Sequence, residues 1–289
     1  MDRSVIYLGE NSTVIFWCKT VEYGIFLLRY MMETPSKDRS TPPVSPGINW
    51  KYEFQQYGTA FLTGLFVFIL LSVYLYFRRG YYDLYIVNKI FAGTSAILLG
   101  LILLIGPGSR AFHRLGFLVQ YRKELGVFAA LLAFAHGLSS YFFLPTHFSQ
   151  TYFWGSGFLT FVFGLGGAIG LLFLLSISHR IAQRLFGPPR WWKMHYWGLR
   201  IVFLLTLLHV GIMKYRSWIS WYQKGGSKEL VHPEWPGAGL LVGWFLAIVL
   251  LIRVVDVVLP KARRVAEVGG IILLIAVYLF TFWWGGRFI

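Results

Sequence analysis

Seven apolar segments, each long enough to cross a bilayer, constrain this chain more than any other feature of its sequence. They lie at 57–77, 86–106, 124–144, 153–178, 191–213, 237–259 and 267–284. A helix needs about 20 mostly apolar residues to cross hydrocarbon, where each backbone polar group must be paired inside the segment. The composition agrees, with 56% hydrophobic residues, 13% charged residues and a mean hydropathy of +0.59. We therefore predict an all-α integral membrane protein, a polytopic bundle of about seven transmembrane helices.

The basic residues indicate the orientation of this bundle. A net charge of +15 is typical of nucleic-acid-binding proteins, but the Lys and Arg residues here lie between the apolar segments and form no recognisable RNA- or DNA-binding motif. Counted by side, 17 of them share the side of the N-terminus, 7 lie on the other side, and 3 fall inside spans. The positive-inside rule then predicts a cytoplasmic N-terminus and an external C-terminus. We expect the lipid bilayer, and no nucleic acid, among the partners.

The stretch 13–32 is apolar but carries three charged residues, Lys19, Glu22 and Arg29. We interpret it as an interfacial or partner-facing helix rather than an eighth span. The N-terminus has no small-residue cleavage site, so we expect no removable signal peptide.

Three histidines, His136, His195 and His209, lie within or at the end of the predicted spans. Ionisable residues inside a membrane are candidates for functional sites. His195 and His209 are 14 residues apart, which places them within about 40° of each other on one helix and about 21 Å apart along its axis. One span separates the helix of His136 from that of His209, so these two helices run in the same direction. Counted from the outer ends, His136 and His209 lie at matching depth in the outer half of the membrane.

Two neutral imidazoles from different helices are the axial ligand set of an electron-transfer haem b. Other redox centres have little support, because Cys18 is the only cysteine and the spans contain few acids. Asp256 is the one deep carboxylate, and we expect it to pair with Arg253 three residues earlier. We therefore predict His136 and His209 as the iron ligands of one haem b, held between parallel helices. The alternative without a cofactor is a pair of hydrogen-bonded histidines, as in a transporter's proton relay.

Three further residues are candidates for binding an anionic or cofactor group. Arg122 precedes His136 by 14 residues and so occupies the place where a second iron ligand opposite His195 would be needed. Arginine does not ligate iron, but its planar fork suits a haem propionate or an anionic headgroup. His195 is either a second ligand, a propionate donor or an interfacial residue. Arg200 either neutralises a propionate, or snorkels to the interface or pairs with a lipid or another helix.

The segment 86–213 resembles the ferric-reductase-like transmembrane domain, a family that includes ferric reductases, NADPH oxidases and the haem-binding membrane subunit of the periplasmic methionine sulfoxide reductase system. The matching motifs are Asn88-Lys89, Ile105-Gly106-Pro107-Gly108-Ser109-Arg110, Arg122-Lys123-Glu124-Leu125-Gly126, Ala135-His136, Trp191-Trp192-Lys193-Met194-His195 and Leu208-His209. Two-haem members carry histidines about 14 residues apart on both helices. Here only the second helix does, which resembles the smaller bacterial members and predicts one haem per chain.

The resemblance implies a haem b protein of a bacterial or archaeal cytoplasmic membrane that relays electrons to an acceptor or a partner subunit. No glycine-rich dinucleotide fingerprint follows a strand, and Gly164-Leu165-Gly166-Gly167 indicates close helix packing. Electrons would then come from quinol, a separate flavoprotein carrying a flavin, or another redox subunit. Whether the chain is an enzyme by itself stays open. The alternatives are a haem-binding anchor subunit of a larger respiratory or photosynthetic complex, and a haem-free transporter or scaffold.

We predict three parts in the chain. Residues 1–56 form the cytoplasmic or interfacial N-terminal segment, 57–259 the ferric-reductase-like haem-binding bundle, and 260–289 an additional C-terminal transmembrane helix.

Overall fold

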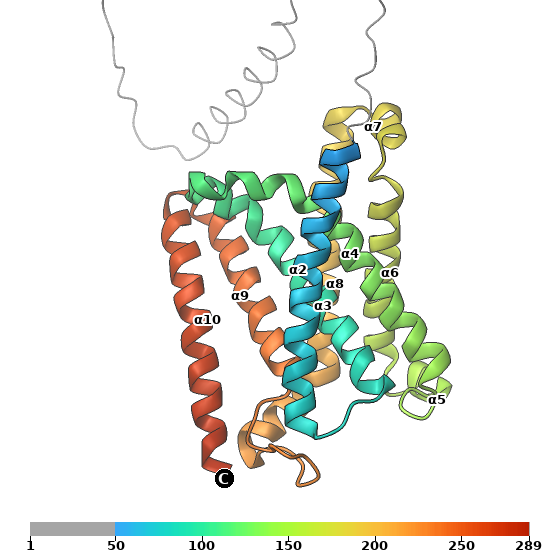
Figure 1. The fold of residues 1–289 in the computed structure, drawn as a ribbon, viewed down its shortest axis with the longest axis vertical. Coiled ribbons are helices and arrows are strands. Elements are labelled where there is room, and N and C mark those ends of the chain that lie inside the picture. Colours follow the sequence, from blue (N-terminus) through green and yellow to red (C-terminus); the bar gives the residue numbers. More distant parts are fainter. Residues whose placement is uncertain (1–49, 289) are drawn as a thin grey trace, which may run out of the picture. The chain divides into compact units, whose positions relative to one another are not determined.

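Seven long helical segments run between the two ends of the bundle (Figure 1) in a computed structural model that describes residues 50–288. Six of them are the helices α2 (Trp50–Arg79), α3 (Leu84–Ala111), α6 (Phe158–Ser176), α8 (Pro188–Lys224), α9 (Ala238–Val258) and α10 (Arg263–Gly285). The seventh is α4 (Arg122–Leu138), extended by a 3₁₀ segment before it, η1 (His113–Tyr121), and a π-helical turn after it, η2 (Ser139–Phe143). The prediction of an all-α polytopic membrane bundle is confirmed.

Short elements connect these helices. They are α5 (Gln150–Trp154), α7 (Arg180–Phe186), η3 (Pro260–Ala262) and the terminal turn η4 (Gly286–Phe288). The predicted interfacial helix at 13–32 lies outside the described residues. Residues 50–56, predicted to belong to the N-terminal segment, are part of α2. The largest difference in length is in α8, which continues eleven residues beyond the predicted end at 213 because no Pro or Gly interrupts it before Gly225.

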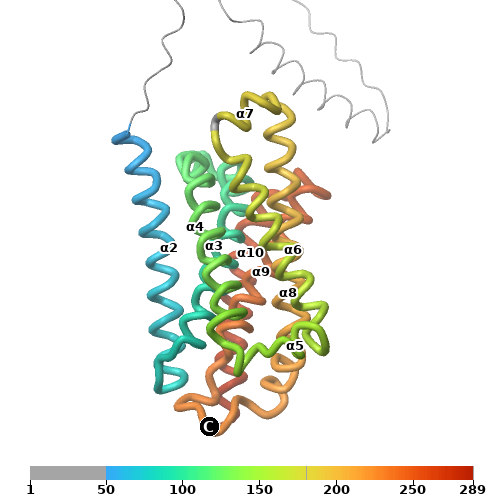
Figure 2. Tube along the Cα trace, turned by 90° about the vertical axis from the view of Figure 1, so that its right-hand side faces the viewer, coloured from blue at the N-terminus to red at the C-terminus, as the bar shows by residue number. Residues whose placement is uncertain are grey.

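Successive long helices alternate in direction, so α4 and α8 run the same way with α6 antiparallel to both (Figure 2). The prediction that the helices of His136 and His209 are parallel is therefore confirmed. In the described chain, α4 packs closely against α2, α3 and α6, and α8 against α3, α6, α7 and α9. The helices α4 and α8 are not closely packed against each other.

Glycines on α6 let this helix approach α8. A Cβ built at Gly170 would lie 2.6 Å from Val202 Cγ2, and one at Gly167 would lie 3.9 Å from Leu205 Cβ. The contacts move back along α8 as they advance along α6, as expected for antiparallel helices. The close packing predicted for the Gly164–Gly167 stretch is thus confirmed.

The core of the bundle is apolar and is built chiefly by α3, α4, α8 and α9, which contribute Leu98, Leu99, Ala129, Val202 and Leu246, each at most 2% exposed. Large apolar side chains also cover the outside, for example Ile272 and Leu279 on α10, which are 62% and 67% exposed. An outer surface of this kind would be unfavourable in water and is what a lipid-facing helix requires.

Candidate functional site

His136 on α4 and His209 on α8 meet in the space between their two helices. Their ring centroids are 6.4 Å apart and their ring planes are inclined by 77°. Both side chains are only partly covered, as are the neighbouring residues 132–135 on α4 and 205–208 on α8. The pairing of these two histidines, inferred from matched depth on parallel helices, is confirmed as a feature of the fold.

Hydrogen bonds to one nitrogen of each ring fix which nitrogen carries the proton. His136 Nδ1 lies 2.9 Å from Asn88 Oδ1, and His209 Nδ1 lies 2.8 Å from the carbonyl oxygen of Thr160. Asn88 is oriented in turn, because its Nδ2 donates to Ser140 Oγ at 2.9 Å. Since both acceptors are carbonyl oxygens, each Nδ1 must donate its proton. Each Nε2 is therefore the unprotonated nitrogen of a neutral ring, and neither makes a hydrogen bond within residues 50–288.

Gly164 makes room for His209 against α6. The carbonyl of Thr160 points along the helix toward residue 164, so a side chain there would stand between that oxygen and an approaching ring. A Cβ built at Gly164 would lie 2.7 Å from His209 Nδ1 and 2.8 Å from its Cε1. The absence of a side chain at this position is thus what allows the His209–Thr160 hydrogen bond.

The separation of the two rings is compatible with both imidazoles binding one haem iron. Two imidazoles on opposite sides of one metal ion, with metal–nitrogen distances of about 2.0–2.1 Å and about 1.1 Å from nitrogen to ring centre, have centroids about 6.3 Å apart. The observed separation of 6.4 Å matches this arrangement. Metal-bound histidines also characteristically donate their other ring N–H to a carbonyl or carboxylate, as both rings do here. The loose packing between α4 and α8 leaves their side chains, rather than their backbones, to bridge the two helices.

Two lysines lie near the pair, Lys89 next to Asn88 on α3 and Lys214 five residues after His209 on α8. The Lys89 ammonium is 3.6 Å from the centre of the Tyr85 ring, and the charge of Lys214 acts on both imidazoles. Neither lysine forms an ion pair with a described residue. From the sequence, Lys89 could be identified only as a basic residue inside a span. The packing of α3 against α4 brings its neighbour Asn88 to His136.

His195 is separate from this pair. Its Nδ1 lies 3.2 Å from the carbonyl oxygen of Trp191, one turn earlier on α8, and its Nε2 lies 3.2 Å from Ser178 Oγ. The ring also lies 4.3 Å from the centre of the Trp191 ring. Both ring nitrogens of His195 therefore have partners, whereas in His136 and His209 only Nδ1 has one among the described residues. Arg122, predicted opposite His195, has no described contact with it.

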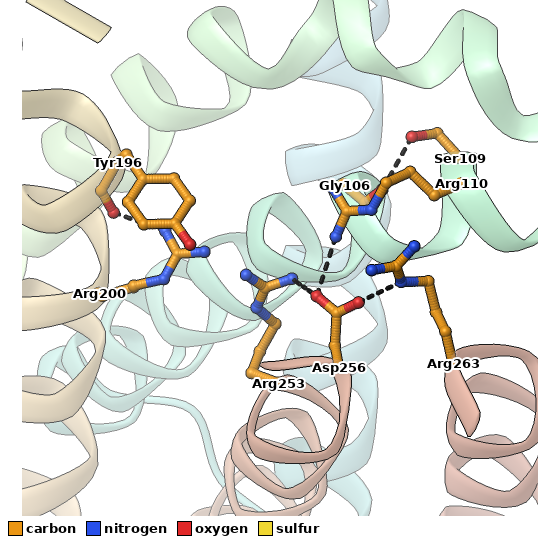
Figure 3. Close-up of polar contacts among 8 residues, drawn as sticks. All are labelled: Gly106, Ser109, Arg110, Tyr196, Arg200, Arg253, Asp256 and Arg263. Atoms are coloured by element: carbon orange, nitrogen blue, oxygen red, sulfur yellow. Dashed lines mark hydrogen bonds and ion pairs between the residues drawn. The ribbon is translucent and has the colours of Figure 1, made fainter. Parts of the chain in front are cut away.

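Arg200 instead lies in a second polar group with Arg253 and Asp256 at the other end of the bundle (Figure 3), and the charge of Arg122 acts on this group. Arg200 donates to the carbonyl oxygen of Tyr196 at 2.6 Å and lies over that ring, and its charge interacts with those of Arg122 and Arg253. The predicted Arg253–Asp256 pair is confirmed at 2.8 Å. Two further arginines, Arg110 and Arg263, contact the same carboxylate, and sequence spacing gave no sign of either because they come from other helices.

Neither a cluster of metal ligands nor similarity to a known protein assigns the site. Across residues 50–288 no group of three or more His, Cys, Asp or Glu side chains could hold a metal ion. This excludes a site with three such protein ligands there, whereas a haem iron needs only two. No protein-family model matches the chain, and no curated protein matches it at a significant level.

Proposed function

We propose that this chain is a haem b electron-transfer protein of the membrane, with His136 and His209 as the axial ligands of one haem. The observation that carries the proposal is the 6.4 Å separation of two imidazoles whose outer nitrogens are both hydrogen-bonded to carbonyl oxygens. A haem held in this way supplies a one-electron redox centre without an open coordination position. That property favours electron relay over binding or activation of a substrate at the iron.

The residues around the pair would hold and tune the group. Asn88 and Thr160 keep both imidazoles neutral and correctly turned, and their hydrogen bonds raise the basicity of the ligating nitrogens. Lys89 and Lys214 are the cations available to neutralise the two propionates. The apolar side chains of α4 and α8 keep water away, which is one of the factors that set the potential of a buried haem.

The function extends to a partner at each end. Electrons would be supplied by quinol, by a separate flavoprotein or by another redox subunit, and passed to an acceptor or partner protein. The pair lies in the half of the bundle near the α2–α3 connection, which the distribution of basic residues predicts to be external. We therefore propose electron flow between the cytoplasmic side and the outer side of the membrane.

A reduced-minus-oxidised absorption spectrum of the purified full chain, with haem quantified per polypeptide, tests this proposal. We expect a low-spin bis-imidazole spectrum and one haem per chain. His136→Ala and His209→Ala should each abolish that spectrum. His113→Ala is the matched control, because His113 is exposed at the start of η1 and makes no described side-chain hydrogen bond.

The outcome also separates the alternatives. A chain that binds no haem when haem is supplied, or an unaltered low-spin spectrum in His136→Ala, would contradict the proposal and favour a transporter or scaffold. If haem is bound, co-purification of further subunits from the native membrane would favour an anchor subunit of a larger complex over a protein that acts alone.

A further inference from the structure

Three arginines from three helices contact a single aspartate at the end of the bundle remote from the histidine pair, and the charges of two more arginines act on this group. The members of this arginine cluster are Arg110 on α3, Arg122 on α4, Arg200 on α8, Arg253 on α9 and Arg263 on α10. The central acid is Asp256 on α9, whose side chain is 4% exposed. Glu267 on α10 is a second carboxylate whose charge interacts with those of Asp256, Arg253, Arg110 and Arg263.

Asp256 is already saturated by three of these arginines. Its Oδ2 accepts from Arg110 Nη2 at 2.9 Å and from Arg253 Nη1 at 2.8 Å, and its Oδ1 accepts from Arg263 Nε (Figure 3). One negative charge thus faces three positive ones. Arg253 Nε, moreover, is buried without any hydrogen-bond acceptor in the described chain.

Arg122 and Arg200 add two further positive charges and bring no carboxylate with them. Arg200 uses only the carbonyl and the ring of Tyr196. Arg122 makes no side-chain hydrogen bond with a described residue, and its Nη1 lies beside Gly106, 3.9 Å from where a Cβ would be. Arg110 Nη1 is 3.7 Å from that same point. Both guanidinium groups therefore lie beside the backbone of Gly106.

Guanidinium groups outnumber carboxylates in the cluster by five to two, in a region where partial burial strengthens their repulsion. Arg110, Arg122 and Arg263 all lie within two residues of a helix end. The ends of membrane-spanning helices are expected near the lipid headgroups, and the distribution of basic residues predicts that this end is cytoplasmic. Planar guanidinium forks are suited to bidentate bonds with phosphate oxygens, and basic pockets between helices on this side of membranes take up anionic lipid headgroups.

We propose that the arginine cluster is a binding site for a phosphate group, with Arg122 and Arg200 as its main ligands. The phosphate comes either from the headgroup of an anionic phospholipid or from a soluble phosphate compound. Asp256 acts as a positioning residue, since it holds Arg110, Arg253 and Arg263 around the site. The helical rise from Arg122 to His136 is about 21 Å, so this site is separate from the histidine pair and does not depend on haem.

The experiment is a ligand titration of the purified full chain in neutral detergent, followed by the midpoint of thermal unfolding. The probes are phosphatidylglycerol, phosphatidylcholine at the same concentration, and inorganic phosphate at constant ionic strength. The test variant is Arg122→Gln/Arg200→Gln. The control is Arg216→Gln, because Arg216 is exposed at the opposite end of α8 and its side chain bonds only Tyr215 among the described residues.

We expect a saturable rise in the midpoint with phosphatidylglycerol and none with phosphatidylcholine. The double variant should weaken this response by about tenfold or more, the loss expected from removing a charge-assisted hydrogen bond, while Arg216→Gln keeps the wild-type affinity. Saturation by inorganic phosphate as well would identify a soluble phosphate compound as the source, and saturation by the anionic lipid alone would identify a headgroup.

The proposal is overturned if wild type responds to neither phosphatidylglycerol nor inorganic phosphate, or if the double variant binds as tightly as wild type. Should the double variant fail to fold, Arg122→Gln and Arg200→Gln are titrated singly, and an unchanged affinity in both single variants has the same meaning. The comparison of the two lipids on the wild-type protein tests the proposal even without variants. Equal responses to phosphatidylglycerol and phosphatidylcholine would overturn it, because they would exclude recognition of net negative charge.

Discussion

If the proposed haem site is correct, a single methyl group at position 164 should weaken haem binding without unfolding the protein. In Gly164→Ala, the new Cβ would lie 2.7 Å from His209 Nδ1, whereas ordinary contacts begin near 3.4 Å. The His209 ring must therefore move by about 0.7 Å, which exceeds the tolerance of about 0.2 Å for a metal–ligand distance. The same movement stretches the 2.8 Å hydrogen bond to the carbonyl of Thr160.

The effect on folding should be small, because two terms oppose each other. Replacing a helical Gly by Ala stabilises a helix by about 1 kcal/mol, and overpacking of one methyl group costs about 1–3 kcal/mol. The imidazole can relieve most of the clash by rotating toward the loosely packed space between α4 and α8. We therefore expect a thermal unfolding midpoint of the haem-free protein close to that of wild type.

Haem binding is where the loss should appear. Displacing an iron ligand and its supporting hydrogen bond should lower haem affinity by about 10- to 100-fold, the range found when the outer partners of metal-bound histidines are removed. The assay is a haem titration of the haem-free protein, followed by the low-spin absorption bands. Gly166→Ala is the matched control, since its Cβ would meet Leu205 Cδ1 at an ordinary 3.6 Å. A Gly164→Ala protein that binds haem as tightly as Gly166→Ala, with an unchanged spectrum, would refute the reasoning.

Three further outcomes are expected. Asn88→Leu should reduce haem affinity by about 10- to 100-fold, because it removes the partner of the His136 Nδ1 proton. Asn88→Asp should lower the reduction potential, because a carboxylate makes the His136 imidazole a stronger donor to the iron. Equal potentials for Asn88→Asp and wild type in redox titration would count against this. His195→Ala should keep one haem per chain by pyridine haemochrome assay, because both nitrogens of His195 already have protein partners; a second haem lost in this variant would overturn the one-haem count. Asp256→Asn should destabilise the fold by about 3–5 kcal/mol in denaturant unfolding, because three arginines lose their shared carboxylate, and a change below about 1 kcal/mol would contradict its positioning role.

Orientation is a property that the sequence predicts and that the fold alone leaves open. The alternation of seven helices places the start of α2 and the end of α10 at opposite ends of the bundle (Figure 1). Which end faces the cytoplasm depends on the distribution of basic residues relative to the membrane potential and the insertion machinery. A reporter fused to the C-terminus that is active only in the cytoplasm would contradict the predicted orientation.

The sequence by itself determined the class of fold, because hydrocarbon permits so few solutions. An apolar run of about 20 residues must pair its backbone within itself, so the seven runs could be assigned as helices from length and composition. Helix direction then followed from counting spans, and matched depth followed from the constant rise per residue. His136 and His209 could therefore be paired before any tertiary contact was known.

Only the tertiary structure decided what surrounds each of these residues. Asn88 and Thr160 reach the two imidazoles, and Arg110 and Arg263 reach Asp256, across interfaces between helices that are distant in sequence. Such contacts depend on how each helix is rotated about its own axis. A helix that is hydrophobic on all sides carries no sequence pattern that indicates this rotation. The same reason separates Arg122 from His195: equal spacing along two helices fixes depth but not the direction in which a side chain points.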